Sequence, residues 1–543
     1  MHDTTLTIVR SASRFFSGTM LSRITGMLRD MALAYAFGTQ STIAALLVAF
    51  RFAHLFRRLF GEGALQTAFI PHFEELRKNL PARAGQFFCD LAISLTAFLV
   101  VLILSIMILL WYLPFFIDFS AGNAEILWLT FLMMPSLLFI CLFGINASLL
   151  QCEKSYFVPS AAPVAFNLIW IIGIFCVASL SSSAAMSGLA TFVVLACLAQ
   201  WAITVPKTIG ILKSYKSSGF FEYNQYFSKD VRRLAKPLIL GIIGVAASQI
   251  NNALDAIFAR WADAEGPAFL WYAIRLQQLP LALFGIALSG ALLPPLARAL
   301  KNNDEVKYHL FLNFALRISF YLMVPMTAAL MIMGDSCVNL IYGRGDFTSL
   351  SVMETTRSLW GYTLGLLPMA LILVLAPAFY AKGDYRTPSL AATGAMIINI
   401  TLNAILVGYV GLGTASVALA TSISAWVNFM WLAYVVSRQQ GFFRVPNLLP
   451  NIGKISLAVG IASISTLAME IAVWGQATSI KIMTDQLPTY SQHTWTQLSH
   501  LAICGITFII TLVISALLLR IENLPNILSE YLNRLFDKKN SKL

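Results

Sequence analysis

Long apolar runs constrain this chain more than any other feature of its sequence. The stretches LAISLTAFLVVLILSIMILLWYL (91–113) and AICGITFIITLVISALLL (502–519) contain no charged residue. A helix of roughly 20 residues crosses the hydrocarbon core of a bilayer, where only helices and closed barrels satisfy the backbone. The whole chain is 58% hydrophobic and 11% charged, far from the usual balance of a soluble domain. It is therefore predicted to be an all-α polytopic membrane protein.

We predict about fourteen transmembrane helices from apolar segments of spanning or near-spanning length. The segments are residues 14–37, 41–60, 86–113, 125–150, 156–180, 187–206, 237–259, 267–296, 310–334, 353–380, 388–409, 412–436, 453–474 and 498–519. The loops between them hold most of the charge, so their Lys and Arg content reports the orientation of the chain.

The distribution of basic residues predicts that both termini are cytoplasmic. With the N-terminus inside, the inside loops and helix ends carry 27 of the 37 Lys and Arg, whereas the outside loops carry 4 and the helices 6. Cytoplasmic loops of membrane proteins have such an excess. The net charge of +12 thus follows from topology, and no nucleic-acid partner is expected. The basic segment 213–236 is predicted to rest on anionic lipid.

An internal repeat divides the chain. The stretch AFRFAHLFRRLFGEGALQTAFIP (49–71) aligns with AIRLQQLPLALFGIALSGALLPP (273–295) at a constant offset, so that Arg51 meets Arg275 and both copies share Leu-Phe-Gly and a later Pro. The copies are six helices apart and run in the same direction. Such parallel repeats are typical of transporters built from two bundles around a central cavity.

The repeat predicts two pseudo-symmetric six-helix bundles followed by two additional C-terminal helices. The predicted divisions are an N-terminal bundle at 1–212, a cytoplasmic linker at 213–236, a C-terminal bundle at 237–438, and helices 13 and 14 with a cytoplasmic tail at 439–543.

Ionisable residues inside the predicted helices indicate a functional cavity. They are Arg23, Arg29, Asp30, Arg51 and Arg275. Each would cost about 2.5–3.5 kcal/mol on insertion scales if it faced lipid, so they are expected to face water or one another. Four arginines against one aspartate leave the cavity positive, which suits an anion. The planar fork of arginine bonds phosphate or pyrophosphate with two hydrogen bonds.

A structural interpretation of these charges stays open. An ion-pair network could join helices 1, 2 and 8, and Arg23 and Asp30, seven residues apart, share a helix face. That network leaves three positive charges unexplained. Arg57 and Arg58, near the cytoplasmic end of helix 2, suit either substrate binding or the positive-inside pattern, and Glu62 is placed to pair with one of them.

A second constellation suggests a cation site. Asp255 lies in helix 7, Asn399 and Asn403 lie one turn apart in helix 11, and Thr421 lies in helix 12. Their oxygens are ligands of the kind that a hard cation such as Na⁺ uses. Interhelical hydrogen bonds are the alternative explanation for such residues in a membrane bundle. No other cofactor is expected.

The chain resembles the lipid II flippase family of bacterial cell-wall synthesis, called MurJ or MviN. The match is dense in SRITGMLRDMALAYAFG (22–38), VAFRFAHLFRRLFGEGALQTAFIP (48–71), YAIRLQQLPLALFGIALSGALLP (272–294), YGRGDFT (342–348) and LAPAFYAKGDYRTP (375–388). The resemblance implies a two-lobed fold of the multidrug/oligosaccharidyl-lipid/polysaccharide exporter superfamily and alternating access. It also implies that helices 13 and 14 line a groove for a polyprenyl tail.

The family's cavity residues correspond to Arg23, Arg29, Asp30, Arg57, Arg58, Glu62 and Arg275 of this chain. Two positions depart from the family pattern: Ala44 stands where an Asp is frequent, and Arg51 replaces a frequent Lys. Losing that Asp makes the cavity more positive.

The resemblance implies a flippase, not an enzyme, that moves an undecaprenyl-pyrophosphate-linked peptidoglycan precursor across the bacterial cytoplasmic membrane. Expected partners are this lipid-linked precursor, membrane lipids and other cell-wall synthesis proteins. Alternatives are a flippase for another polyprenyl-linked glycan and a cation-coupled drug exporter of the same fold. A membrane glycosyltransferase would need catalytic carboxylates and usually a metal-binding acidic pair at a membrane face, and the sequence has no such pair.

Overall fold

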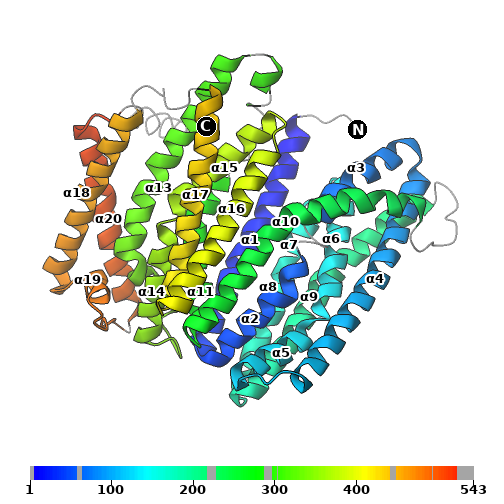
Figure 1. Ribbon diagram of the computed structural model, residues 1–543, viewed down its shortest axis with the longest axis horizontal. Coiled ribbons are helices and arrows are strands. Elements are labelled where there is room, and N and C mark those ends of the chain that lie inside the picture. The colour runs from blue at the N-terminus through cyan, green and yellow to red at the C-terminus, as the bar shows by residue number, and fades with distance from the viewer. Residues whose placement is uncertain are drawn as a thin grey trace, which may run out of the picture. The chain divides into compact units, whose positions relative to one another are not determined.

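The computed structural model describes residues 5–57, 64–216, 228–286, 296, 298–302, 304–440, 448–491 and 493–521. In this part of the chain all regular structure is helical, as predicted (Figure 1). The first helices are α1 (Thr5–Phe37), α2 (Ser41–Phe56), α3 (Ala64–Asn79), α4 (Pro81–Tyr112), η2 (Leu113–Phe115), α5 (Ala121–Met133), α6 (Ser136–Cys152), α7 (Phe157–Ala161), α8 (Pro163–Val177), α9 (Ser182–Lys216) and α10 (Lys229–Ala262). The remaining ones are α11 (Gly266–Pro280), η3 (Leu281–Ile286), α13 (Glu305–Tyr342), α14 (Ser349–Thr363), α15 (Leu366–Ala381), α16 (Arg386–Asn403), η4 (Ala404–Tyr409), α17 (Ala415–Gln440), α18 (Leu448–Trp474), α19 (Thr478–Met483) and α20 (Thr494–Leu518).

Nine spans among the described residues are long and apolar enough to cross a membrane, or ten if the bent pair α5–α6 is one span. The protein is therefore a multi-pass membrane protein. Four predicted segments are not among these spans: 14–37, 41–60, 237–259 and 267–296. Each of them forms a helix, α1, α2, α10 and α11, and each carries ionisable residues of the predicted cavity or cation site. In the long helices α1 and α10 such charges reduce the apolar character of a span, whereas the described parts of α2 and α11 are shorter than a span.

Helix ends support the sequence repeat. The helices α1 and α10 end at Phe37 and Ala262, and α2 and α11 end at Phe56 and Pro280, so both pairs keep nearly the offset found in the sequence. A π-helical turn follows at Arg57 in the first copy and at Leu281 in the second. π-Helical turns are rare and are frequent at functional sites.

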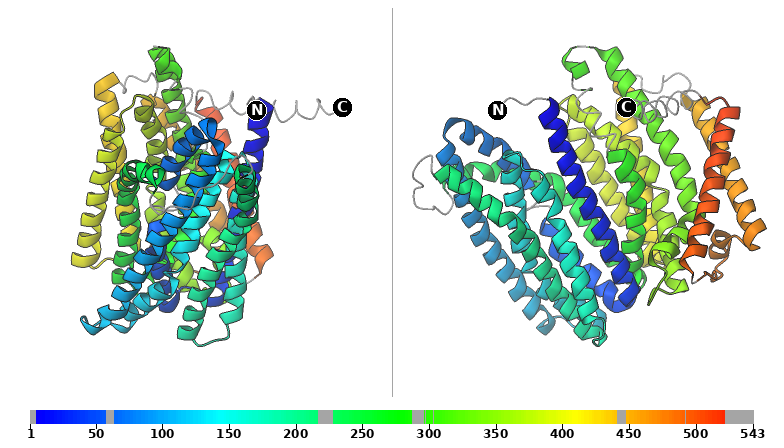
Figure 2. Two further views of the ribbon diagram at one scale, coloured as in Figure 1. Left: turned by 90° about the vertical axis from the view of Figure 1, so that its right-hand side faces the viewer. Right: turned by 180° about the vertical axis from the view of Figure 1, so that it is seen from behind.

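Contacts group the chain into two compact units. Unit 1 comprises residues 1–268 and 345–347, and unit 2 comprises residues 269–344 and 348–543. In unit 1, α1 packs on α8, and α10 packs on α2 and α3 (Figures 1 and 2). The predicted domain boundaries stay a prediction.

Two glycines fasten the short segment 345–347 to unit 1. Gly38 and Gly345 both have a positive φ, of 54° and 62°, which an L side chain adopts only with strain. A Cβ on Gly38 would lie 2.2 Å from the carbonyl oxygen of Asp346, and the Asp346 amide donates to the carbonyl of Tyr35 at 3.0 Å. Close backbone approach thus explains why both glycines occur in the motifs of the predicted family.

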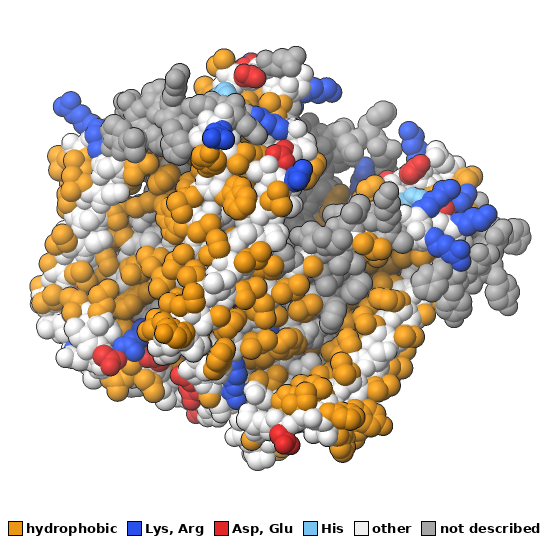
Figure 3. Space-filling view, in the orientation of Figure 1, with side chains coloured by type: hydrophobic (Ala, Val, Ile, Leu, Met, Phe, Trp, Pro, Cys, Tyr) orange, Lys and Arg blue, Asp and Glu red, His pale blue; other side chains and the backbone are white. Residues whose placement is uncertain are grey.

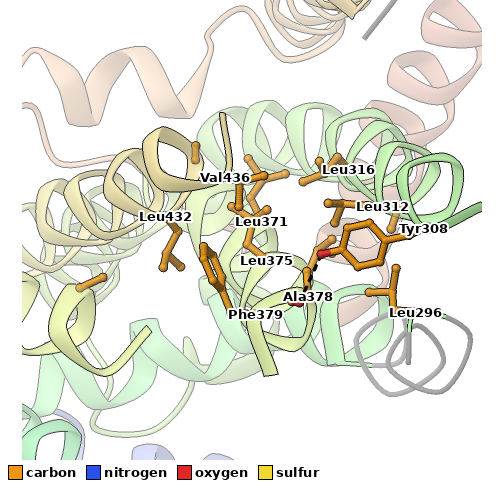
Figure 4. Packing of buried hydrophobic residues seen from close by; sticks show 14 of the residues in the cluster. Leu296, Tyr308, Leu312, Leu316, Leu371, Leu375, Ala378, Phe379, Leu432 and Val436 are labelled. Carbon is orange, nitrogen blue, oxygen red and sulfur yellow. Dashed lines mark hydrogen bonds between the residues drawn. The ribbon is translucent and has the colours of Figure 1, made fainter. Parts of the chain in front are cut away.

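Unit 2 has its own apolar core. Leu312 and Leu316 of α13 meet Leu375 of α15 and Leu432 of α17, all nearly inaccessible to solvent (Figure 4). The Tyr308 hydroxyl donates to the Ala378 carbonyl at 3.2 Å, which satisfies the one polar atom of this buried ring. At the other side of α13, α18 and α20 pack on each other and on α13 (Figures 1 and 2).

The surface agrees with a lipid environment. In Figure 3, hydrophobic side chains cover the sides of the helices, and Lys and Arg gather mainly near helix ends. Many of the large apolar side chains are exposed, for example Val101, Leu109 and Ile464. A soluble protein rarely exposes apolar patches of this extent.

Candidate functional site

The charged residues of α1 lie against α8. Arg29 and Asp30 are buried, with 7% and 3% of their surfaces exposed. Arg29 donates from Nε and Nη2 to Asp30 Oδ1, at 3.1 and 2.8 Å. Burial of both charges is tolerable because they form an ion pair with two hydrogen bonds. The sequence favoured Arg23 as the residue on the face of Asp30, but the long side chain of Arg29 bends back to its neighbour.

Residues of α8 surround Arg29, among them Asn167, Trp170 and Phe166. Its Nη1 donates to Asn167 Oδ1 at 3.1 Å, and its guanidinium carbon lies 4.7 Å from the centre of the Trp170 ring. The Asn167 amide donates in turn to Thr25 Oγ1 at 3.0 Å and to the Ser22 carbonyl at 3.1 Å. These bonds fasten α1 to α8 and hold the guanidinium in one orientation.

Asn167 and Trp170 were not predicted from the sequence. The sequence contained one indication of such a contact, because Asn167 is a single amide residue in the apolar run PVAFNLIWIIGIFCV (163–177). A polar residue in such a helix either bonds across helices or marks a site, but the sequence does not say which helix it meets.

The other arginines of unit 1 are more accessible. Arg23 is exposed, and Arg51 and Arg57 are half-buried. Arg51 Nη1 donates to the Asn252 carbonyl at 3.4 Å, which brings α2 to the turn of α10 just before Asp255. Among its described residues, unit 1 therefore contains four of the predicted arginines, Arg23, Arg29, Arg51 and Arg57, and the two predicted aspartates, Asp30 and Asp255.

Arg275 belongs to unit 2, where α11 presents it beside an aromatic ring. Its guanidinium carbon lies 4.4 Å from the centre of the Trp271 ring, one helical turn earlier. Such a cation–π contact keeps the planar group oriented. Arg58 and Glu62, which were predicted with these residues, lie outside the described residues.

The candidate cation-binding residues belong to different units. In unit 2, Asn403 Nδ2 donates to Asn399 Oδ1 at 3.0 Å, and Asn399 Nδ2 donates to Thr421 Oγ1 at 3.2 Å. Asp255 is buried in unit 1, where Asn251 Nδ2 lies 3.4 Å from Asp255 Oδ2. Among the described residues, no group of three or more His, Cys, Asp or Glu side chains could hold a metal ion. The predicted Na⁺ site stays a prediction.

The geometry suits recognition of an anion rather than covalent chemistry. Arg29 already donates from Nε, Nη1 and Nη2 to Asp30 and Asn167, so Arg23, Arg51 and Arg57 supply the more accessible positive charge on α1 and α2. Guanidinium groups bind phosphate oxygens strongly. The assignment of all these residues to a substrate site stays a prediction.

Comparisons with known proteins agree on one family. A family model described as lipid II flippase MurJ matches residues 33–484. A probable lipid II flippase MurJ of Chlamydia pneumoniae is 32% identical over 437 residues, which cover 80% of this chain and 78% of that protein. The corresponding protein of Chlamydia trachomatis is 31% identical over 474 residues, which cover 86% and 85%.

A solved structure shares the fold. It is a lipid II flippase MurJ in an inward closed conformation, with a TM-score of 0.71 and 23% sequence identity. The match covers 93% of this chain and 98% of that chain.

Proposed function

This chain belongs to the MurJ family of lipid II flippases, and on that premise we propose that it moves lipid II from the inner to the outer leaflet of the bacterial cytoplasmic membrane. Lipid II is an undecaprenyl-pyrophosphate-linked peptidoglycan precursor. Translocation leaves its covalent bonds unchanged, so we propose no catalytic residue. The observation that carries the proposal is the set of arginines on α1 and α2, inside a helical membrane protein of this family.

The arginines would bind the pyrophosphate of the precursor. On unit 1, Arg23 is exposed and Arg51 and Arg57 are half-buried. Arg275 of unit 2 is proposed as a further substrate-binding residue. Guanidinium groups replace the water that hydrates the pyrophosphate and so lower the cost of taking a multiply charged head group into the membrane. Asp30 orients Arg29 and offsets one positive charge. The lower net charge would weaken binding of the pyrophosphate and so permit its release.

Alternating access would use the two copies of the repeat. The helices α1 and α2 correspond to α10 and α11, and the π-helical turns after α2 and α11 interrupt the regular helix at equivalent positions. Interrupted helices are common at the binding sites of transporters with internal repeats. The two C-terminal helices α18 and α20, outside the repeat, would accommodate the polyprenyl tail.

The orientation follows from the basic residues. We propose that both termini are cytoplasmic, because 27 of the 37 Lys and Arg then lie on the inside. The membrane lipids and other cell-wall synthesis proteins are the proposed further partners. Asp255 of unit 1, and Asn399, Asn403 and Thr421 of unit 2, are proposed as Na⁺ ligands.

Depletion of the protein in its source cell tests the proposed substrate. Lipid II should accumulate with its head group in the inner leaflet, and mass spectrometry should identify it. Accumulation of a different polyprenyl-linked glycan would identify that lipid, and not lipid II, as the substrate. Unchanged lipid-linked precursors would reject a flippase role in this cell.

A further inference from the structure

A buried polar cluster lies in unit 2 where α13, α18 and α20 pack together. Asp335 of α13 has no exposed surface, and Glu470 of α18 is 2% exposed. His500 of α20 lies beside them, with 17% of its side chain exposed. The substrate site and the candidate Na⁺ site use none of these three residues.

His500 connects the carboxylate of α18 with α13. Its Nε2 lies 3.4 Å from Glu470 Oε1, and its Nδ1 lies 3.3 Å from Ser336 Oγ. The same Glu470 oxygen accepts hydrogen bonds from the amide and the hydroxyl of Thr478, both at 2.9 Å. Glu470 Oε1 thus accepts two hydrogen bonds from Thr478 and also faces the imidazole of His500.

Asp335 is less well satisfied. Its Oδ2 accepts from the Tyr490 hydroxyl at 3.3 Å. The Thr478 side chain and the Ser336 amide also face this carboxyl group, although Oδ1 makes no hydrogen bond of good geometry to a described residue. A fully buried carboxylate that lacks a donor at one oxygen is costly when it is ionised. A proton on this group removes the charge and supplies a donor.

The electrostatic neighbours of Asp335 are themselves titratable. Glu470 opposes its negative charge, and His500 favours it. Tyr490, Cys337 of α13 and Cys504 of α20 are the other titratable groups that interact with Asp335. His500 lies against Glu470, and Asp335 interacts electrostatically with both, so the charge of each group depends on the charges of the other two.

A cavity of about 90 Å³ reaches this cluster at His500, which is the only one of the three residues that lines it. It is also lined by Ser336 and Tyr490, and by the exposed residues Ser491 and Thr496 at its rim. Gln497, only 8% exposed, also lines it, and its Oε1 has no hydrogen-bond partner among the described residues. A space of this size with polar groups in its wall holds water.

We propose that Asp335, Glu470 and His500 form a proton-binding site that exchanges protons with water through this cavity. The proton passes from cavity water to an imidazole nitrogen or a carboxylate oxygen, and it returns to water as the pH rises. Ionisable residues within membrane proteins commonly serve as proton relays. The loop 475–493 is predicted to face outside, so the site would sense external pH. The proposal does not depend on which lipid the protein moves.

Infrared difference spectroscopy of the purified protein in lipid nanodiscs tests the site. Spectra are recorded between about pH 5 and about pH 8, where imidazole and coupled carboxyl groups exchange protons. We expect a carboxylic-acid carbonyl band that is lost as the pH rises. The band should be absent in the double variant Asp335→Asn/Glu470→Gln. It should persist in Asp304→Asn, which alters a partly exposed carboxylate just before α13.

A second variant keeps the test decisive if the double variant does not fold. His500→Gln retains both carboxyl groups but removes the imidazole, so it should shift the midpoint at which the band is lost, whereas Asp304→Asn should not. The proposal is overturned if the unaltered protein shows no such band, or if band and midpoint are the same in the double variant and in His500→Gln as in the unaltered protein.

Discussion

Arg29 is held by partners that lie far from it in the sequence. Asn167 and Trp170 are about 140 residues away, and only the packing of α1 on α8 brings them to the guanidinium. The sequence predicted a costly charge in a membrane helix and therefore a compensating partner. It could not identify that partner, because an amide in an apolar helix is compatible with many neighbours.

A double variant separates the structural role of Arg29 from substrate binding. Arg29→Ala alone should abolish growth complementation, but it also removes two hydrogen bonds and an ion pair from the buried Asp30, and breaking a buried ion pair costs about 3–5 kcal/mol. The variant Arg29→Gln/Asp30→Asn removes both charges and keeps hydrogen-bonding groups, so it should insert normally and still fail to complement. Membrane fractionation and growth measure the two effects. Normal growth of the double variant would make the pair purely structural.

Arg23 and Arg275 should be essential as arginines. Arg23→Ala and Arg275→Ala should insert into the membrane and lose complementation, and the Lys variants should recover only part of it, because the charge remains but the bidentate fork is lost. Arg438→Ala is the matched control for Arg275. Arg438 also lies over an aromatic ring one turn earlier, at 5.2 Å from Tyr434, but near the end of α17. Equal growth of the Arg23, Arg275 and control variants would reject the anion site.

At the scale of the helices, the described residues of each predicted segment are mainly helical, although some segments, such as 125–150 and 353–380, are divided between two helices. Periodicity and apolar length suffice for that, since the bilayer permits few alternatives. The equivalent helix ends at Phe56 and Pro280 agree with the repeat found in the sequence. The sequence did not predict α3 (Ala64–Asn79) or α19 (Thr478–Met483), because a short amphipathic helix lacks the length signal of a span.

Single cysteines in a cysteine-free background test the orientation of the helices. Phe119→Cys and Val410→Cys should react with an impermeant thiol reagent from outside intact cells, because both follow predicted spans that end outside. Gly219→Cys, in the predicted cytoplasmic linker, should react only after permeabilisation. The reverse pattern would contradict the orientation inferred from the basic residues.

At the scale of the whole molecule, transport should depend on membrane potential. Export of the anionic pyrophosphate from a negative interior is favourable by roughly 2.3 kcal/mol per charge for each 100 mV. Return of an empty, net-positive cavity toward the inside is favoured by the same field. The sequence has no GxxxxGK[ST] loop for a nucleotide. Collapse of the potential with an ionophore, at constant pH gradient, should lower the amount of precursor in the outer leaflet.

Undiminished flipping at zero potential would favour an electroneutral exchange, with Asp255 as the coupling residue. A sodium titration distinguishes this alternative, because Asp255→Asn should then change the sodium dependence of transport. If the rate of transport does not depend on sodium in either the unaltered protein or Asp255→Asn, the role of Asp255 is structural.

The most direct test of the central claim is reconstitution of the purified protein in liposomes that contain lipid II in both leaflets. An impermeant reagent first modifies the head groups in the accessible leaflet. The account predicts that the protected head groups then become accessible with the unaltered protein, and remain protected with Arg23→Ala/Arg275→Ala and in protein-free liposomes. Equal protection in all three samples would contradict the proposal that this chain is a lipid II flippase.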